Sequence, residues 1–222
     1  MPSGNCWRTT DGDTTRKREL TIHQEVTNNM PDLGLQAQAE QHFSFLVLEM
    51  GYKCTVSTPY LVRFESHTGF IELVFDGNRS FELGLLVGKT GSESCGNPPF
   101  SIGEILRLCR APEALQFSLV QVTSKEVLAS FVAQLSQMLR RYGAEFIAGN
   151  DKRFAELAEQ RRREIEIYAQ ERDLRMARTE AEAAWSRKDY ATVVKVYKPL
   201  RASLSTSEVG KLEFAEKKLA VP

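Results

Sequence analysis

The chain has 222 residues, of which 42% are hydrophobic, and its 29 Lys and Arg side chains equal its 29 Asp and Glu side chains in number. A chain of this length can bury a core in one or two domains, and it lacks the excess of positive charge that draws proteins to nucleic acid or anionic lipid. Because no stretch approaches the roughly 18–20 uninterrupted apolar residues of a membrane-spanning helix, we expect neither a nucleic-acid nor a membrane partner.

Residues 1–30 are polar and contain few large apolar side chains. Such a segment buries too little surface to offset the entropy of ordering, so we expect a disordered tail, without the apolar core of a secretory signal. The four cysteines, Cys6, Cys54, Cys95 and Cys109, are spread along the chain and form no CxxC pair. We therefore expect a cytoplasmic protein with reduced thiols, in which Cys54 and Cys109 are small buried residues.

Residues 31–122 have the pattern of an α+β domain. Phe43, Leu46, Val47 and Met50 recur at helical spacing, and Gly51 is suited to end that helix. Four runs rich in β-branched and aromatic residues follow, separated by turn residues, at 52–57, 60–66, 70–76 and 80–88. Their alternation predicts a four-stranded antiparallel meander with a single covered face. A capping box formed by Ser101 and Glu104 then predicts a short helix.

Residues 123–222 are predicted to be helical throughout. Thr123 and Glu126 form a capping box, and Gly143 is a suitable stop for the helix that follows. Residues 151–187 carry nine acidic and nine basic side chains with a sparse apolar seam, which is typical of a long exposed helix. Glu159 with Arg163, and Glu171 with Arg175, are spaced as i,i+4 ion pairs. A shorter helical hairpin is expected at 189–219, with Asp189 and Ser205 as N-caps.

Catalytic and metal-binding patterns are weak in this sequence. The three histidines, His23, His42 and His67, stand apart from any nucleophile motif, and the spacing of His and Cys residues matches no zinc site. Gly88-Lys89-Thr90 has the letters that end a phosphate-binding loop, but position 83 is Leu rather than the required Gly. We therefore interpret this segment as a strand end running into a turn, and we expect no cofactor and no metal.

Four polar residues of the predicted sheet are the candidates for an acid–base site. Arg63, Glu65, Glu72 and Glu82 alternate with apolar residues, so carboxylates of adjacent strands could face each other on one surface of the sheet. The same arrangement is more typical of a solvated outer face on which Arg63 pairs with a neighbouring carboxylate.

The segment at about 43–108 resembles small bacterial α+β proteins of the immunity and toxin-neighbour type. The residues that carry this resemblance are Phe45-Leu46, Gly51-Tyr52, Val62-Arg63-Phe64-Glu65-Ser66, Ser80-Phe81-Glu82-Leu83 and the helix at 101–108. The resemblance implies a function in partner binding and supplies no catalytic residue. Near the C-terminus, residues 181–219 resemble a single tetratricopeptide-type hairpin, with Ala184-Trp185 on the first helix and Val193-Val194 on the second.

Two functions from different classes follow from these patterns. The first is a non-enzymatic cytosolic protein–protein interaction module, with immunity or defence as a specific case and self-association through 151–187 as a further possibility. The second is a small enzyme with an acidic site on the sheet face. The charge is also unevenly divided: residues 31–122 carry six basic and ten acidic side chains, whereas 123–222 carry 19 and 15.

Overall fold

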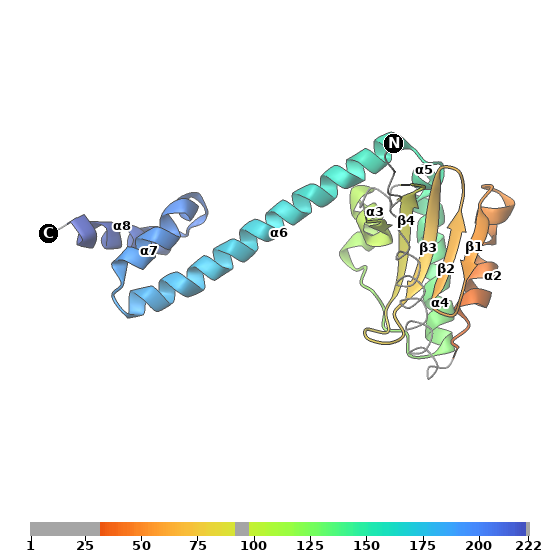
Figure 1. Cartoon of the computed structure of the whole chain (residues 1–222), viewed down its shortest axis with the longest axis horizontal. Coiled ribbons are helices and arrows are strands. Elements are labelled where there is room, and N and C mark those ends of the chain that lie inside the picture. The colour runs from red at the N-terminus through yellow and green to blue at the C-terminus, as the bar shows by residue number, and fades with distance from the viewer. Residues whose placement is uncertain (1–31, 92–97, 221–222) are drawn as a thin grey trace, which may run out of the picture. The chain divides into compact units, whose positions relative to one another are not determined.

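The computed structural model describes residues 32–91 and 98–220 (Figure 1). The chain forms two compact units, which divide between Leu157 and Ala158. The fold class is α+β, as the sequence predicts: a helix, an antiparallel sheet, and then a mostly helical region that includes one long helix. The expected tail at 1–30 lies outside the described residues, as do Cys6, Cys95 and His23.

The sheet is an antiparallel meander whose spatial order equals its order in the chain. Its strands are β1 (Lys53–Ser57), β2 (Leu61–Glu65), β3 (Gly69–Phe75), β4 (Leu83–Lys89) and β5 (Phe100–Ser101). The four predicted strands are confirmed. The fifth, β5, is a two-residue strand that pairs Phe100 and Ser101 with Val87 and Leu86 immediately before the predicted short helix.

The turn before β4 shifts the start of that strand. The Asp76 carboxylate accepts hydrogen bonds from the backbone N–H groups of Asn78, Arg79 and Ser80, which closes a tight turn. Phe81 then adopts a positive φ of 56°, a conformation that strands exclude. Regular pairing with β3 therefore begins at Leu83, three residues later than expected.

Helices cover one face of this sheet. They are α2 (Leu35–Leu48), α3 (Ile102–Leu108) and α4 (Lys125–Tyr142), and α2 and α4 pack on each other as well as on the strands (Figure 1). The strand side chains that join this core all lie on the same face, namely Val62, Phe64, Ile71, Leu73, Phe75, Leu83, Leu85 and Val87. The expectation of a single helix-covered face is therefore met among the described residues.

Helix α2 buries a wider surface than its sequence spacing predicts. Phe43 and Leu46 are buried as expected, but Val47 and Met50 are exposed, and Phe45 is buried instead. The helix ends at Leu48, so Met50 lies beyond its last turn. Phe45 is covered from the side of α4, where the Arg140 guanidinium lies 3.8 Å from its ring centroid.

The first unit also extends farther along the chain than the expected boundary at residue 122. Helix α4, the short helix α5 (Ala144–Ile147) and the first turns of α6 (Asp151–Ser186) all contribute side chains to the sheet core, up to Leu157. Helix α4 buries Leu128, Phe131, Val132, Leu135 and Leu139 in this core. The N-cap of α4 is Ser124, whose hydroxyl accepts from Val127 N, and not Thr123 as the sequence suggested.

Several contacts tie the start of α6 to the sheet. The Tyr52 hydroxyl donates to the Ile147 carbonyl at 2.9 Å, and Lys89 forms an ion pair with Asp151. On the other side of the helix, the Arg153 guanidinium pairs with Glu145 and Glu156, each at 2.6 Å. The beginning of α6 therefore belongs to the first unit.

The second unit is a small helical assembly with its own core. It contains the C-terminal part of α6, then α7 (Tyr190–Tyr197), the 3-10 helix η3 (Lys198–Ser203) and α8 (Thr206–Ala220). Its buried side chains are Ala181, Ala184, Val193, Tyr197, Leu212 and Ala215. The predicted N-caps are confirmed: the Asp189 carboxylate accepts from Thr192 N, and Ser205 and Glu208 bond each other reciprocally.

Candidate functional site

The structure brings together three of the four polar residues proposed for an acid–base site. Arg63 lies between two carboxylates, 2.8 Å from Glu72 and 3.4 Å from Glu65. Their position follows from the strand register, because Arg63 is directly opposite Glu72 across β2 and β3. Glu82 is separate: it lies before β4 and forms an isolated bridge with Gln121. Leu86, and not Glu82, is the residue opposite Glu72 across β3 and β4.

This cluster is an ion-pair network on the sheet face that carries no core side chains. The Arg63 and Glu72 side chains are only 15% and 12% exposed, and the Arg63 guanidinium also lies 3.9 Å from the centroid of the Phe70 ring. The arrangement therefore fits a structural pair, as the period-two pattern indicated.

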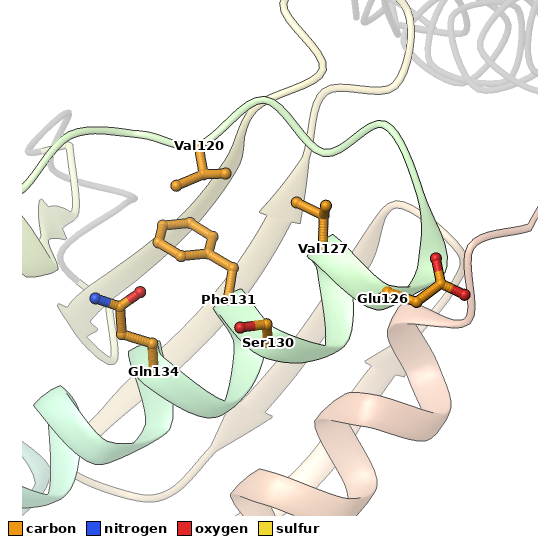
Figure 2. A pocket seen from close by; sticks show the side chains of 6 residues that line it. All are labelled: Val120, Glu126, Val127, Ser130, Phe131 and Gln134. Atoms are coloured by element: carbon orange, nitrogen blue, oxygen red, sulfur yellow. The ribbon is translucent and has the colours of Figure 1, made fainter.

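A hollow of about 320 Å³ opens on the N-terminal half of α4. Figure 2 shows Val120, from the segment that leads into the helix, beside Phe131 and Val127 of α4. Three polar side chains of the same helix, Glu126, Ser130 and Gln134, complete its lining. Hydrogen bonding to Ser124 lowers the pKa of Glu126, so this carboxylate stays charged and is a poor general base.

No pattern in the sequence points to this hollow, because five of its lining residues belong to one helix and the sixth, Val120, comes from the preceding segment. None of the four sheet residues lines it. Nearby in the chain, Leu115 at the end of the 3-10 helix η2 (Pro112–Leu115) is 94% exposed, and Leu119 is also exposed. Apolar groups in and beside an open hollow favour contact with another macromolecule over chemistry on a small substrate.

Among the described residues, the remaining reactive side chains lie apart from one another. Cys54 is exposed, contrary to expectation, because β1 is an edge strand with a bulge between Cys54 and Val56. Cys109 is half-buried at the end of α3, where its sulfur lies 3.4 Å from an Arg153 nitrogen. Lys89 of the Gly-Lys-Thr segment is paired with Asp151, and the Thr90 hydroxyl donates to the Ser66 carbonyl, as suits a strand end.

The middle of α6 is stabilised by charge pairs along its own length. Glu159 accepts hydrogen bonds from both Arg162 and Arg163, the latter being the predicted i,i+4 pair, and Arg162 also reaches Glu166 at 2.5 Å. The two guanidinium groups lower the pKa of Glu159 from 4.5 to about 2. Farther along, Arg172 pairs with the adjacent Asp173.

The same part of α6 exposes large apolar side chains. Ile165, Tyr168 and Met176 are spaced by three and eight residues, which places them on one side of the helix. They are 61%, 61% and 65% exposed. We call these three residues the α6 seam. Ile167, 56% exposed, points to a different side.

The second unit carries an aromatic cluster beside its core. Trp185, Tyr190 and Phe214 contact one another edge to face, with ring centroids 5.5–5.8 Å apart. The Lys211 ammonium lies 5.7 Å from the Trp185 ring and pairs with Glu182, which raises the pKa of Lys211. The three rings pack edge to face on each other, as in a small aromatic core.

Comparisons with protein-family models, with curated proteins and with solved structures give no match to this chain. Among the described residues, no group of His, Cys, Asp or Glu side chains is arranged to hold a metal ion. No helix in the described ranges 32–91 and 98–220 is long and apolar enough to cross a membrane.

Proposed function

We propose that the protein is a non-enzymatic cytosolic interaction module whose long helix α6 binds a protein partner through the α6 seam. The observation that carries this proposal is the exposure of Ile165, Tyr168 and Met176 on one side of a helix. Aligned apolar side chains of this size on a charged helix are typical of a binding surface.

The helix does not need the seam for its own folding. The ion pairs of Glu159, Arg162 and Arg163 support the helix from its polar sides, and the hairpin core begins only at Ala177 and Ala181. Each seam side chain would gain about 1.5–3 kcal/mol on full burial by a partner, which is enough for the seam to dominate an interface.

The partner we infer is a protein that presents an apolar groove or a second amphipathic helix. Arg172 lies on the same side of α6 as the seam, between Tyr168 and Met176, and would contact an acidic or aromatic group there. Toxin neutralisation or assembly of a bacterial defence complex is the specific case that the immunity-type resemblance suggests. A second copy of the chain is another possible occupant of the seam.

The alternative of a small enzyme with an acidic site draws no support from the geometry of its proposed residues. Arg63 holds Glu65 and Glu72 as an ion-pair network, and Glu82 lies apart from them. The hollow on α4 contains one carboxylate, whose pKa is lowered rather than raised.

The test uses full-length protein as bait in its native host, with a seam variant, I165S/Y168S/M176S, and a matched control, I167S. Ile167 is 56% exposed but points to another side, so I167S removes one exposed apolar side chain of α6 and leaves the seam intact. We expect the wild type and I167S to enrich the same partner and the seam variant to lose it. Binding of the purified partner, measured by calorimetry, should weaken at least about tenfold in the seam variant.

Two results would contradict the proposal. One is enrichment of the same partner by the seam variant and the wild type alike. The other is failure of wild-type bait to enrich any partner over the seam variant at physiological salt, combined with a monomeric mass by light scattering at high concentration. A dimer that the seam substitutions dissociate would identify the second copy as the partner.

A further inference from the structure

The charged residues that share a side of α6 with the seam are all basic. An α-helix turns by about 100° per residue, so residues three, four or seven apart lie on one side. Arg161 precedes Ile165 by four residues, whereas Arg172 and Arg175 follow Tyr168 by four and seven. All three arginines therefore lie on the side of the α6 seam.

The carboxylates of this stretch lie on other sides of the helix. Between residues 158 and 179 they are Glu159, Glu164, Glu166, Glu171 and Asp173. Each is about a quarter of a turn or more from the midline of the seam. Glu159 and Glu166 accordingly pair with Arg162, and Glu159 also pairs with Arg163. The middle of α6 thus separates its charges, with the positive ones beside the seam.

Two of the arginines beside the seam are open to a ligand from outside. The Arg172 side chain is 56% exposed, and the carboxylate that pairs with it belongs to the adjacent Asp173. Arg175 is also exposed. Its predicted i,i+4 ion pair with Glu171 does not form in the part of the chain that the structure describes. A carboxylate from a partner can therefore reach both guanidinium groups.

The helical hairpin packs on α6 away from the seam. The residues of α6 that are buried in the hairpin core are Ala181 and Ala184, and Ala177 is buried as well. The turn of the helix places these alanines roughly opposite the seam. The second unit therefore leaves the seam uncovered. Small side chains, Ala158 and Ala169, lie between the large ones on the seam side and allow a second helix to approach closely.

We propose that the occupant of the α6 seam is an acidic amphipathic helix of another protein. This inference rests on the proposed function and names the chemistry of the partner. Apolar side chains of the partner helix cover Ile165, Tyr168 and Met176, which are 61–65% exposed without it. Its Asp or Glu side chains, one helical turn apart, pair with Arg172 and Arg175, and guanidinium groups suit this role because they bind carboxylates through two parallel hydrogen bonds.

The same charges disfavour the pairing of two seams. A second copy that presented its own seam would bring its arginines against Arg172 and Arg175, with no carboxylate on that side of either helix to compensate them. Like charges that face each other across a helix–helix interface select against a partner. The seam therefore selects an acidic protein over a second copy of the chain.

The experiment uses two synthetic helical peptides as probes of the full-length protein. Each has about 21 residues, or three heptads, with Leu at positions a and d and Ala elsewhere, and they differ only in carrying Glu or Lys at positions e and g. Binding is measured by fluorescence anisotropy of the labelled peptide at about 0.15 M salt. We expect the Glu peptide to bind at least about tenfold more tightly than the Lys peptide, and the difference to shrink at about 0.5 M salt.

Two single variants locate the charge effect. R172E reverses an exposed arginine beside the seam, whereas R163E reverses an exposed arginine on another side of α6. We expect R172E to weaken binding of the Glu peptide about fivefold and R163E to change it less than about twofold, because screening limits the effect of a charge across the helix. The double variant R172E/R175E should reverse the preference in favour of the Lys peptide. Circular dichroism confirms that each variant keeps its helix content.

The proposal is overturned if the Glu peptide binds no more tightly than the Lys peptide, or if R172E and R163E have equal effects. It is also overturned if light scattering shows a dimer that I165S/Y168S/M176S dissociates, because the seam then accepts its own copy. Each of these results leaves the proposed function in place, since the seam could still bind a partner of different charge. The proposed function itself fails only when the seam variant captures the native partner as well as the wild type does, or when no partner is captured.

Discussion

Arg63 and Glu72 form an ion pair, on the sheet face that carries no core side chains, whose two side chains are both largely shielded from water, at 15% and 12% exposure. Removing one member of such a pair leaves the other charge without its counter-ion in a poorly hydrated place. The variant R63M keeps an unbranched apolar stem over Phe70 but removes the charge. We expect it to lower the free energy of unfolding by about 2 kcal/mol, measured by urea denaturation.

The matched control is R172M on α6, where Arg172 and Asp173 are each 56% exposed. An exposed pair of this kind contributes little, so R172M should change stability by no more than about 0.5 kcal/mol. The double variant R63M/E72L should recover most of the loss, because it removes the shielded Glu72 carboxylate and leaves only Glu65, whose side chain is 31% exposed, without Arg63. An R63M effect as small as that of R172M would show that the sheet pair is as well solvated as the surface one.

Replacing glycine by alanine should have opposite effects on stability at Gly88 and at Gly210. A Cβ on Gly88 would lie 2.2 Å from the Phe70 ring, so G88A forces that buried side chain to move and should destabilise the protein by about 1–3 kcal/mol. A Cβ on Gly210, inside α8, meets nothing within 4 Å. G210A should therefore stabilise the second unit by about 0.5–1 kcal/mol through helix propensity. Urea denaturation of both variants tests the pair, and a shift in the same direction would refute it.

At the scale of single residues, period-two alternation predicts which side chains share a face of the sheet. It does not predict which residue of the neighbouring strand lies opposite each of them. It placed Arg63, Glu65 and Glu72 correctly on one side. It failed for Glu82, because the Asp76-capped turn and the positive φ of Phe81 delay β4 until Leu83. It also failed for Cys54, which follows the inward pattern but lies on an edge strand, where a bulge leaves it exposed.

Helix α8 depends on Glu208 for both its N-terminus and its attachment to α6. The Glu208 carboxylate accepts from Arg178 at 2.7 Å and from Ser205 N, and these contacts lower its pKa from 4.5 to about 2. The folded-state pKa lies below the unfolded one, so as the pH falls the unfolded state takes up the proton first. The contribution of Glu208 to stability is therefore complete above about pH 4.5 and is lost as the pH approaches 2.

The measurement is the urea midpoint of the second unit, followed by Trp185 fluorescence between pH 5 and 2 in a W7F background, where Trp185 is the only tryptophan. We expect the midpoint to fall across this window in the wild type, and E208Q to start lower and fall less. The control E216Q changes a carboxylate of the same helix, one that lies 3.9 Å from Arg201. A wild-type slope that E208Q leaves unaltered would assign the titration to other carboxylates.

The sequence predicts where the helices of this chain begin and end better than it predicts the surfaces on which they pack. The boxes at Ser101 and Ser205 and the cap at Asp189 were all identified correctly, since capping is a contact between residues three apart. The N-cap of α4 was misplaced by one residue because Thr123 and Ser124 are adjacent candidates. The two-residue strand β5 is too short for any periodicity, and only its pairing with β4 defines it.

The assignment of α4 to the first unit could not be obtained from local patterns. Its apolar stripe indicates an amphipathic helix but does not say which surface covers that stripe. In the structure it covers α2, where the Ser136 hydroxyl donates to the His42 carbonyl 94 residues away. The α6 seam, in contrast, was foreseeable, because a charged helix with few apolar residues has no means of burying them within itself.

At the scale of the whole molecule, one helix belongs to two separate cores. Phe154 and Leu157 of α6 are buried in the first unit, whereas Ala181 and Ala184 of the same helix are buried in the second. The stretch between them carries ion pairs of Glu159 with Arg162 and Arg163. Cooperative unfolding requires shared buried contacts, so the two units should unfold in separate transitions.

Two substitutions of equal kind test this independence. Leu73 in the first core and Leu212 in the second are both 0% exposed, so L73A and L212A should each cost about 2–5 kcal/mol in the unit that contains them. In a W7F background Trp185 is the only tryptophan, and it lies beside Tyr190 and Phe214 in the second unit. The urea midpoint measured by Trp185 fluorescence should therefore fall in L212A and stay unchanged in L73A. Far-UV circular dichroism should detect the destabilisation in both variants. If L73A lowers the Trp185 midpoint as much as L212A does, the two cores unfold as one, and α6 transmits stability between them along its charged middle.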